Sequence, residues 1–261
     1  MPENPAPSAQ ETTSLTEWLQ TPPGRYLLAW EQAEMNSAVA DIFGFHALQL
    51  GLPQIDALAA NRMPHQWLAN HSPMPGAIFL TDFSALPFQA NSLDLVVLPH
   101  TLELSVDPHT TLREVERVLV PEGRVVISGF NPISLWGLRQ QRGHVYHRLG
   151  LGKPFLPQKE LIGYWRLRDW LRLLGFEVEV GRFGCYRPAL SSEKWLQRFA
   201  WMDSAGDRWW PILGAVYFLV AVKRVHGMTL LSPSWRVTRL PEAAPVSVAR
   251  ESIEMTARGN I

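Results

Sequence analysis

The apolar positions along the chain form short continuous runs that alternate with segments of helical spacing. The clearest run is LDLVVLPH at 93–100, in which Leu95 to Leu98 leave no polar face. Runs of this kind are typical of strands that are buried on both faces of a sheet. Other runs predict further strands at 46–51, 65–70, 76–82, 124–130, 176–183 and 215–225.

Helical spacing fills most of the intervals between these runs. Asp107-Pro108 suits a helix N-terminus, because Asp caps free amide groups and Pro fits the first turn. An apolar stripe of Leu112, Val115 and Leu119 follows that pair. Further helices are predicted from Leu15 up to a break at Pro22-Pro23-Gly24, at 26–43, at 54–60, at 167–174 before a Gly175 cap, and after Ser191-Ser192.

This alternation predicts an α/β fold with a seven-stranded, mostly parallel sheet and helices on both faces. The run at 176–183 alternates apolar and polar residues, as an edge strand does. No long helix separates it from the last strand, so these two are predicted to form an antiparallel edge hairpin with a helical insertion. Ligands of such sheets bind at the carboxyl ends of the strands, where the strand order reverses.

Composition narrows the class of protein. Hydrophobic residues make up 46% of the 261 residues, which is enough for a sizeable core. The 24 basic and 24 acidic residues balance, which disfavours a protein that coats nucleic acid. The apolar stretch at 211–222 is shorter than the about 20 residues that a bilayer span needs. With a single cysteine and no signal-peptide pattern, the sequence predicts a cytoplasmic protein.

One domain is predicted at 15–235, made of a helical lead-in at 15–43 and a core at 45–225. Residues 1–14 and 236–261 have few large apolar residues and no sustained period. They are predicted to be flexible tails.

The middle of the chain carries an ordered series of motifs. FSALPF follows Asp82 at a strand end, SLDLVVLPHTLE spans 92–103 and LREVERVLVPEGRVVISG spans 112–129. Farther on, LRDWLRLLGFEVEV at 167–180 joins a helix to a strand through Gly-Phe. Over about residues 45–225 the chain resembles the class I S-adenosylmethionine-dependent methyltransferases of the type 11 group. The resemblance implies a Rossmann-like sheet, S-adenosylmethionine as cofactor and a methyl acceptor that the sequence does not identify.

The resemblance also implies a place for the cofactor at the strand ends. Asp82 would accept from the adenine amino group, with Phe83 and Leu86 as an apolar wall. Pro99 and His100 end the neighbouring strand, close to the methyl donor. Taken alone, Asp82 can equally be a turn residue that binds its own loop.

The family's first motif, written roughly as acidic-x-G-x-G-x-G, is degenerate here. In LQLGLPQID, Gly51 remains, Gln49 stands where the acid belongs, and Pro53 removes an amide donor. After the second strand, Asn70 stands where the family has an acid that binds the ribose. Gln49, Gly51 and Asn70 are still predicted to bind the cofactor. Either binding persists with altered geometry, or this protein has lost it.

Two further pairs are candidates for the chemistry of transfer. His100 and Glu103 can deprotonate an acceptor, although many methyl transfers need only positioning. Arg139 and Arg142 lie in a basic loop, 139–153, that contains no acidic residue. They are predicted to bind an anionic acceptor such as a phosphate, a carboxylate or a nucleic-acid backbone, the alternative being a solvated surface insertion.

Two functions of different classes stay open. The first is methyl transfer, which the intact 80–130 segment favours. The second is a non-catalytic interaction protein on the same fold that uses the basic loop and a Trp-rich segment, which the degenerate first motif favours. Trp165, Trp170 and Trp195 are themselves predicted to be core residues. No metal site is expected, because His144 and His147 have no acid or cysteine nearby.

Overall fold

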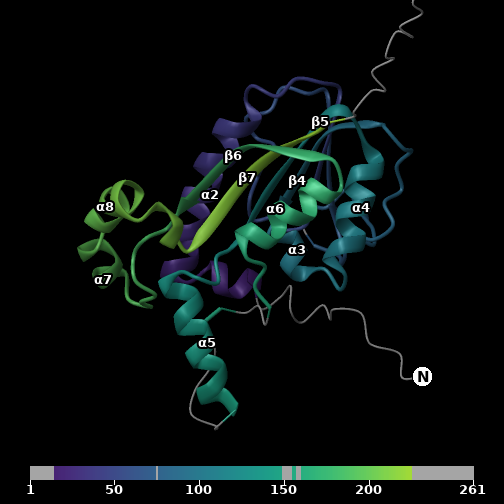
Figure 1. The fold of residues 1–261 in the computed structure, drawn as a ribbon. Coiled ribbons are helices and arrows are strands. Elements are labelled where there is room, and N and C mark those ends of the chain that lie inside the picture. The colour runs from purple at the N-terminus through teal and green to yellow at the C-terminus, as the bar shows by residue number, and fades with distance from the viewer. Residues whose placement is uncertain (1–14, 75, 149–154, 157–159, 225–261) are drawn as a thin grey trace, which may run out of the picture. The chain divides into compact units, whose positions relative to one another are not determined.

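The computed structural model describes residues 15–74, 76–148, 155–156 and 160–224, and they contain a seven-stranded sheet in the order β3-β2-β1-β4-β5-β7-β6 (Figure 1). β1 to β5 pair in parallel, whereas β7 is antiparallel to both β5 and β6. The predicted fold class, including the antiparallel hairpin at the edge, is therefore confirmed. The strands are β1 His46–Leu50, β2 His65–Asn70, β3 Phe79–Leu80, β4 Leu93–Pro99, β5 Leu119–Phe130, β6 Phe176–Gly184 and β7 Val216–Lys223.

Helices cover both faces of the sheet, as predicted. Leu95 and Val97 of β4 pack with α2 in one hydrophobic core. The alternate residues Val96 and Leu98 pack with α4 and α6 in a second core on the other face. This double burial explains why β4 shows no polar face in the sequence. The helices are α2 Pro22–Val39, α3 Thr101–Leu104, α4 Pro108–Val118, α5 Leu135–Arg148, α6 Tyr164–Leu173, α7 Glu193–Arg198 and α8 Trp201–Trp209, with the 3-10 turn η1 Pro211–Leu213.

Helix α2 begins earlier than the sequence predicts. The predicted break is confirmed, since the helical residues 15–19 end before Pro22. Pro22 and Pro23 themselves open α2, because the first turn has no use for their missing amide hydrogens. Thr21 is the N-cap, and its side chain accepts from the Gly24 amide. Leu119 likewise begins β5 instead of ending α4. The predicted strand at 76–82 is reduced to Phe79–Leu80.

The insertion between β6 and β7 consists of α7, α8 and η1, as the hairpin prediction requires. The prediction that Trp165 and Trp195 are core residues is wrong, because their exposed fractions are 50% and 51%. Leu167 and Leu171 fill the buried side of α6, and Leu196 fills that of α7. Among the described residues, no helix is long and apolar enough to cross a bilayer. The predicted tails at 1–14 and 236–261 lie outside these residues, so their boundaries stay predictions.

Lys223, at the end of β7, connects this strand to the C-terminal end of α4. Its side chain is almost fully buried, and Nζ donates to the carbonyl oxygens of Glu116 and Leu119 at 2.6 and 2.9 Å. The same ammonium lies 2.9 Å from the Glu116 carboxylate. A positive charge at the C-terminus of a helix stabilises it, because unpaired carbonyl groups collect there.

We therefore predict that Lys223→Met lowers the free energy of unfolding by about 2–3 kcal/mol, the range for losing hydrogen bonds to a buried charge. Urea denaturation measures this change. Arg224→Met is the matched control, because Arg224 makes its ion pairs with Glu177 and Glu122 at the exposed edge. It is expected to cost less than about 1 kcal/mol. Equal losses in the two variants would contradict the assignment.

Candidate functional site

The strand order reverses between β1 and β4, so the candidate site lies at the carboxyl ends of these strands. Leu50 ends β1 and Pro99 ends β4. The Thr101 hydroxyl, in the first turn of α3, donates to the Leu50 carbonyl and joins the two ends. Pro99, predicted to border the methyl donor, is buried at this junction.

Gln49 organises the turn that follows β1. Its amide nitrogen donates to the carbonyl oxygens of Gly51, Leu52 and Ile55 at 3.2, 3.1 and 2.7 Å. Its amide oxygen accepts from the Ala57 amide at 3.1 Å. These bonds replace backbone bonds of a helix, so 54–60 forms turns and the predicted helix there is wrong. The loop needs a side-chain donor at position 49, which a carboxylate is not.

The same turn leaves little open space next to β1. Gly51 has φ of +77°, a conformation that glycine adopts without strain, and Leu52 follows with φ of +44°. The Leu52 side chain is fully buried in the core on the α2 face. The glycine-rich turn of the family is thus replaced by a loop whose interior is filled by the side chains of Gln49 and Leu52.

Because the amide of Gln49 is a donor to three carbonyl groups, we predict that Gln49→Glu destabilises the protein even though it restores the residue type of the family. The carboxylate would face three acceptors, and an expected loss of about 2–4 kcal/mol follows from burying an unpaired charge. Chemical denaturation measures it. Gln54→Glu, on the exposed side of the same loop, is expected to change stability by less than about 0.5 kcal/mol. An unchanged or higher stability of Gln49→Glu contradicts this account of the loop.

A cavity of about 290 Å³ opens between the segments that follow β2 and β3 and the connection from α3 to α4. Two predicted residues, Asp82 and Phe83, line it. Phe83 is buried, and its ring centroid lies 6.2 Å from that of His71, which follows β2. Asn70, by contrast, turns its amide to the Ser72 carbonyl and does not line this cavity. The other residues around the cavity are Ser84, Leu104, Ser105, Val106, Asp107 and Thr110.

Asp82 binds its own turn through one oxygen. Oδ1 accepts from the backbone amide and the hydroxyl of Ser84 at 2.9 and 2.7 Å. Both hydrogen bonds lower the pKa of Asp82, and the bond from the Ser84 backbone amide has the larger effect. The carboxylate therefore stays ionised. The turn role and the ligand role are compatible, since Oδ2 remains to accept from a ligand.

Three buried charged groups meet at the end of β4. His100, with φ of +52°, places Nδ1 2.8 Å from Glu103 and Nε2 2.9 Å from Glu31 of α2. The side chains of His100 and Glu31 have exposed fractions of 0%, and that of Glu103 is 1%. Glu103 also accepts from the Phe130 amide at 2.7 Å, which ties the cluster to β5. We call Glu31, His100 and Glu103 the buried charge cluster.

The carboxylates keep His100 protonated. Burial by itself lowers the pKa of His100, but the charges and hydrogen bonds of Glu31 and Glu103 outweigh it and raise the pKa to about 10. Burial raises the pKa of Glu103, against the effect of His100. A protonated imidazole has no lone pair with which to accept a proton. The role of His100 or Glu103 as a base stays a prediction, and for His100 it requires prior loss of this proton.

The site residues predicted from the sequence do not include Glu31, although its position in the helical pattern indicates a buried partner. Glu31 lies on the buried stripe of α2 between Leu27 and Met35, with four residues on either side. A carboxylate at an apolar position of a helix indicates a buried partner, because an isolated buried charge is costly.

We predict that the ion pairs of His100 stabilise the protein below about pH 6.5 and that this contribution falls as the pH rises toward about 10. The sign follows because the folded state holds a proton that the unfolded state has already released. The melting temperature of the wild type should therefore fall as the pH rises over this range. His100→Gln should be less stable by about 3–5 kcal/mol at pH 6. The melting temperature of this variant should also depend less steeply on pH than that of the wild type. Equal pH dependence in the two proteins would exclude a charged His100.

Arg139 and Arg142, predicted to bind the acceptor, lie on α5 instead of a loop. Both side chains are exposed, and the Arg139 guanidinium lies 4.6 Å from the ring centroid of Phe155. α5 begins just after β5 and so starts at the same edge of the sheet as the cavity (Figure 1). The side chains of His144 and His147 lie outside the described residues. The described part of the chain holds no group of His, Cys, Asp and Glu side chains suited to a metal.

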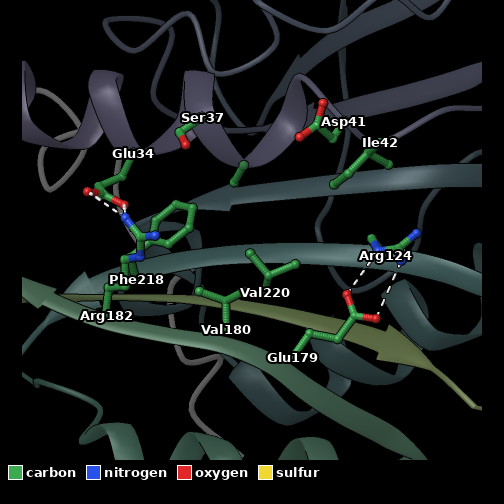
Figure 2. Close-up of a pocket in the computed structure, with 11 residues that line it drawn as sticks. Glu34, Ser37, Asp41, Ile42, Arg124, Glu179, Val180, Arg182, Phe218 and Val220 are labelled. Atoms are coloured by element: carbon green, nitrogen blue, oxygen red, sulfur yellow. Dashed lines mark hydrogen bonds and ion pairs between the residues drawn. The ribbon is translucent and has the colours of Figure 1, made fainter.

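A second cavity, of about 300 Å³, lies between α2 and the strands β6 and β7 (Figure 2). Its floor is apolar, with Ile42, Val180 and Phe218, and charged pairs border it. One of these pairs is Glu34 with Arg182, at 3.1 Å. Glu179 pairs with Arg124 at 3.0 Å, and Asp41 adds a third acidic side chain to the border.

The strand order, with β7 antiparallel between β5 and β6, defines the class: a class I methyltransferase fold. Solved structures with this fold include an S-adenosylmethionine-dependent methyltransferase from Archaeoglobus fulgidus, with a TM-score of 0.52 and 16% identity, covering 75% of this chain and 94% of that one. Another, from Thermotoga maritima, has a TM-score of 0.50 and 14% identity, covering 76% and 92%. At such identities the likeness shows the fold alone.

Sequence comparisons give the family. Residues 50–127 match the type 11 family model, described as a methyltransferase domain. YafS of Escherichia coli K12, an uncharacterized protein, is 32% identical over 228 residues, which cover 87% of this chain and 88% of YafS. A malonyl-[acyl-carrier protein] O-methyltransferase of Halorhodospira halophila is 41% identical over 58 residues, covering 22% and 20%. The chain belongs to the type 11 group of the class I S-adenosylmethionine-dependent methyltransferases.

Proposed function

We propose that the protein transfers a methyl group from S-adenosylmethionine to an acceptor whose identity is open. The observation that carries the proposal is the cavity that follows β2 and β3, which joins an ionised carboxylate, Asp82, to an aromatic wall, Phe83. An adenine ring offers an amino donor and an apolar face, and these two residues match both. Family membership supplies the cofactor class.

The residues present fit the adenosine part of the cofactor best. Asp82 Oδ2 would accept from the adenine amino group, and Phe83 and Leu104 would enclose the ring. Gly51 would lie beside this ring site, since a side chain there would touch Phe83 at 3.6 Å and Thr101 at 3.5 Å. Gln49 would act through the loop that it holds, as a positioning residue.

When bound, S-adenosylmethionine supplies an electrophilic methyl group on a sulfonium. The contribution of the chain would be to orient both reactants and to keep water away, as the buried ends of β1 and β4 favour. Arg139 and Arg142, exposed in the middle of α5, would attract an anionic acceptor to the helix that begins at the same edge of the sheet.

We expect isothermal titration to detect binding of S-adenosylmethionine and S-adenosylhomocysteine, and we expect Asp82→Ala to weaken both about tenfold. That factor corresponds to one hydrogen bond to a charged acceptor. Asp169→Ala, on the exposed side of α6, is the matched control and should bind like the wild type. Absence of binding at millimolar ligand in the wild type would falsify the proposed function.

The interaction-protein alternative rests on a specific observation, the loop after β1 that Leu52 and Gln49 fill. Exposed tryptophans of the α7–α8 insertion, Trp195, Trp201 and Trp209, offer a surface for a partner. The same titration separates the two functions, because a non-catalytic module that has lost the site binds neither nucleoside.

A further inference from the structure

We propose that the carboxyl edge of the sheet carries a surface that docks on a bilayer containing anionic lipid. This surface, the interfacial patch, joins exposed apolar side chains to two arginines of α5. Its apolar part consists of Ile133, Leu135, Leu138, Trp209, Ile212 and Leu213, and its charged part consists of Arg139 and Arg142. The inference concerns where the protein works, and it stands whether or not methyl transfer is its activity.

The apolar residues of the patch come from two segments that meet at Asn131. The Asn131 side-chain nitrogen donates to the carbonyl oxygens of Ile212 and Gly214 at 2.7 and 2.9 Å. Its side-chain oxygen accepts from the Ile133 amide at 3.2 Å. The segment that leads into α5 and the turn η1 therefore lie side by side, where β5 ends and β7 begins.

The apolar side chains of the patch remain in contact with solvent. Trp209 has an exposed fraction of 74% and Ile133 one of 52%, and the fractions of the other four lie between 43% and 48%. Single exposed apolar residues are ordinary, but a contiguous group of them marks an interaction site. The apolar stretch at 211–222 is thus divided, because β7 is buried whereas Ile212 and Leu213 stay outside.

The exposed face of α5, which projects from this edge of the sheet, changes from apolar to basic along the helix (Figure 1). Leu138, Arg139 and Arg142 stand three, four and seven positions after Leu135, the spacing of a single helix face. All four side chains are exposed, and Trp136 is buried on the opposite side. The arginines therefore extend the surface that the two leucines begin.

The net charge of the patch is positive. The chain has no acidic residue from 123 to 159, and residues 193–213 carry three acidic and three basic side chains, so the surplus comes from α5. Guanidinium groups bind phosphate through paired hydrogen bonds, and basic residues near a bilayer are attracted to anionic headgroups. Tryptophan and aliphatic side chains beside arginines are typical of proteins that lie on a membrane surface.

A second copy of the chain fits this patch less well than anionic lipid does. A twofold interface repeats the same residues on both sides. It would bring together the arginines of both copies, and the patch contains no acidic residue to pair with them. The anion that Arg139 and Arg142 are expected to bind is therefore assigned to a lipid phosphate.

Cosedimentation of the full chain with sucrose-loaded vesicles tests the inference. We expect binding to vesicles of phosphatidylcholine mixed with phosphatidylglycerol, and binding at least about tenfold weaker to phosphatidylcholine alone. High salt should weaken binding to the mixed vesicles, because it screens the charge of the arginines. Excess glycerol phosphate should leave this binding unchanged. Displacement by glycerol phosphate would assign the arginines to a soluble ligand and overturn the inference.

Variants locate the contact. Arg139→Gln combined with Arg142→Gln should weaken binding to the mixed vesicles about ten- to thirtyfold. Trp209→Ser should weaken it about tenfold, because it removes an apolar anchor. The matched controls are Arg62→Gln combined with Arg172→Gln, and Phe43→Ser. They remove the same charge, and an aromatic ring that is 75% exposed, from the amino edge of the sheet, and they should bind like the wild type.

All the substituted side chains are exposed, so circular dichroism should show that each variant is folded. The inference is overturned if the wild type stays in the supernatant with both kinds of vesicle, or if patch and control variants lose binding equally. Light scattering after size-exclusion chromatography tests the other occupant. A wild-type dimer that Trp209→Ser converts to a monomer would assign the patch to a second copy and would also overturn the inference.

Discussion

A protonated imidazole between two carboxylates connects the parts of this protein that form its site. His100 joins the end of β4 to α2 through Glu31 and to β5 through Glu103. Burial makes each of these groups costly alone, so all three depend on one another for their charge state. The left-handed backbone at His100 directs the ring into this position. The helix α2 is thereby held at the carboxyl edge of the sheet by charge as well as by apolar packing.

Much of the fold could be predicted from the sequence, because the burial of each strand determines the order of apolar and polar residues along it. β4 is apolar at Leu95 to Leu98 since each face of the strand contacts a different core. The edge strand β6 alternates at its start, where Phe176 and Val178 pack in the core and Glu177 and Glu179 are exposed. The errors arose where side chains replaced backbone bonds. Gln49 turned a predicted helix at 54–60 into a loop, and Thr21 allowed α2 to begin at two prolines.

The candidate site was predictable only in part. Asp82 and Phe83 line one cavity, as the motif order implied, and Asn70 does not. Val106 and Thr110 were missed because they follow β4 in a segment recognised only as the start of a helix. Glu31 was missed because its partners lie about seventy residues away in the sequence. The local pattern shows only a carboxylate on an apolar helix stripe and does not identify what it pairs with. Whether Gln49, Gly51, Pro99 and His100 touch a cofactor stays a prediction.

The strand order has a consequence for how the chain acquires its structure during synthesis. Of the strands in the described part of the chain, β7 leaves the ribosome last, yet it lies between β5 and β6. Until β7 is complete, the nascent chain exposes one edge of β5, and β6 has no neighbour in the sheet. Unpaired edges favour association with other chains. The edge of β5 therefore stays unpaired from the translation of Phe130 to the translation of Lys223, and chaperone binding is most useful to the nascent chain in that interval.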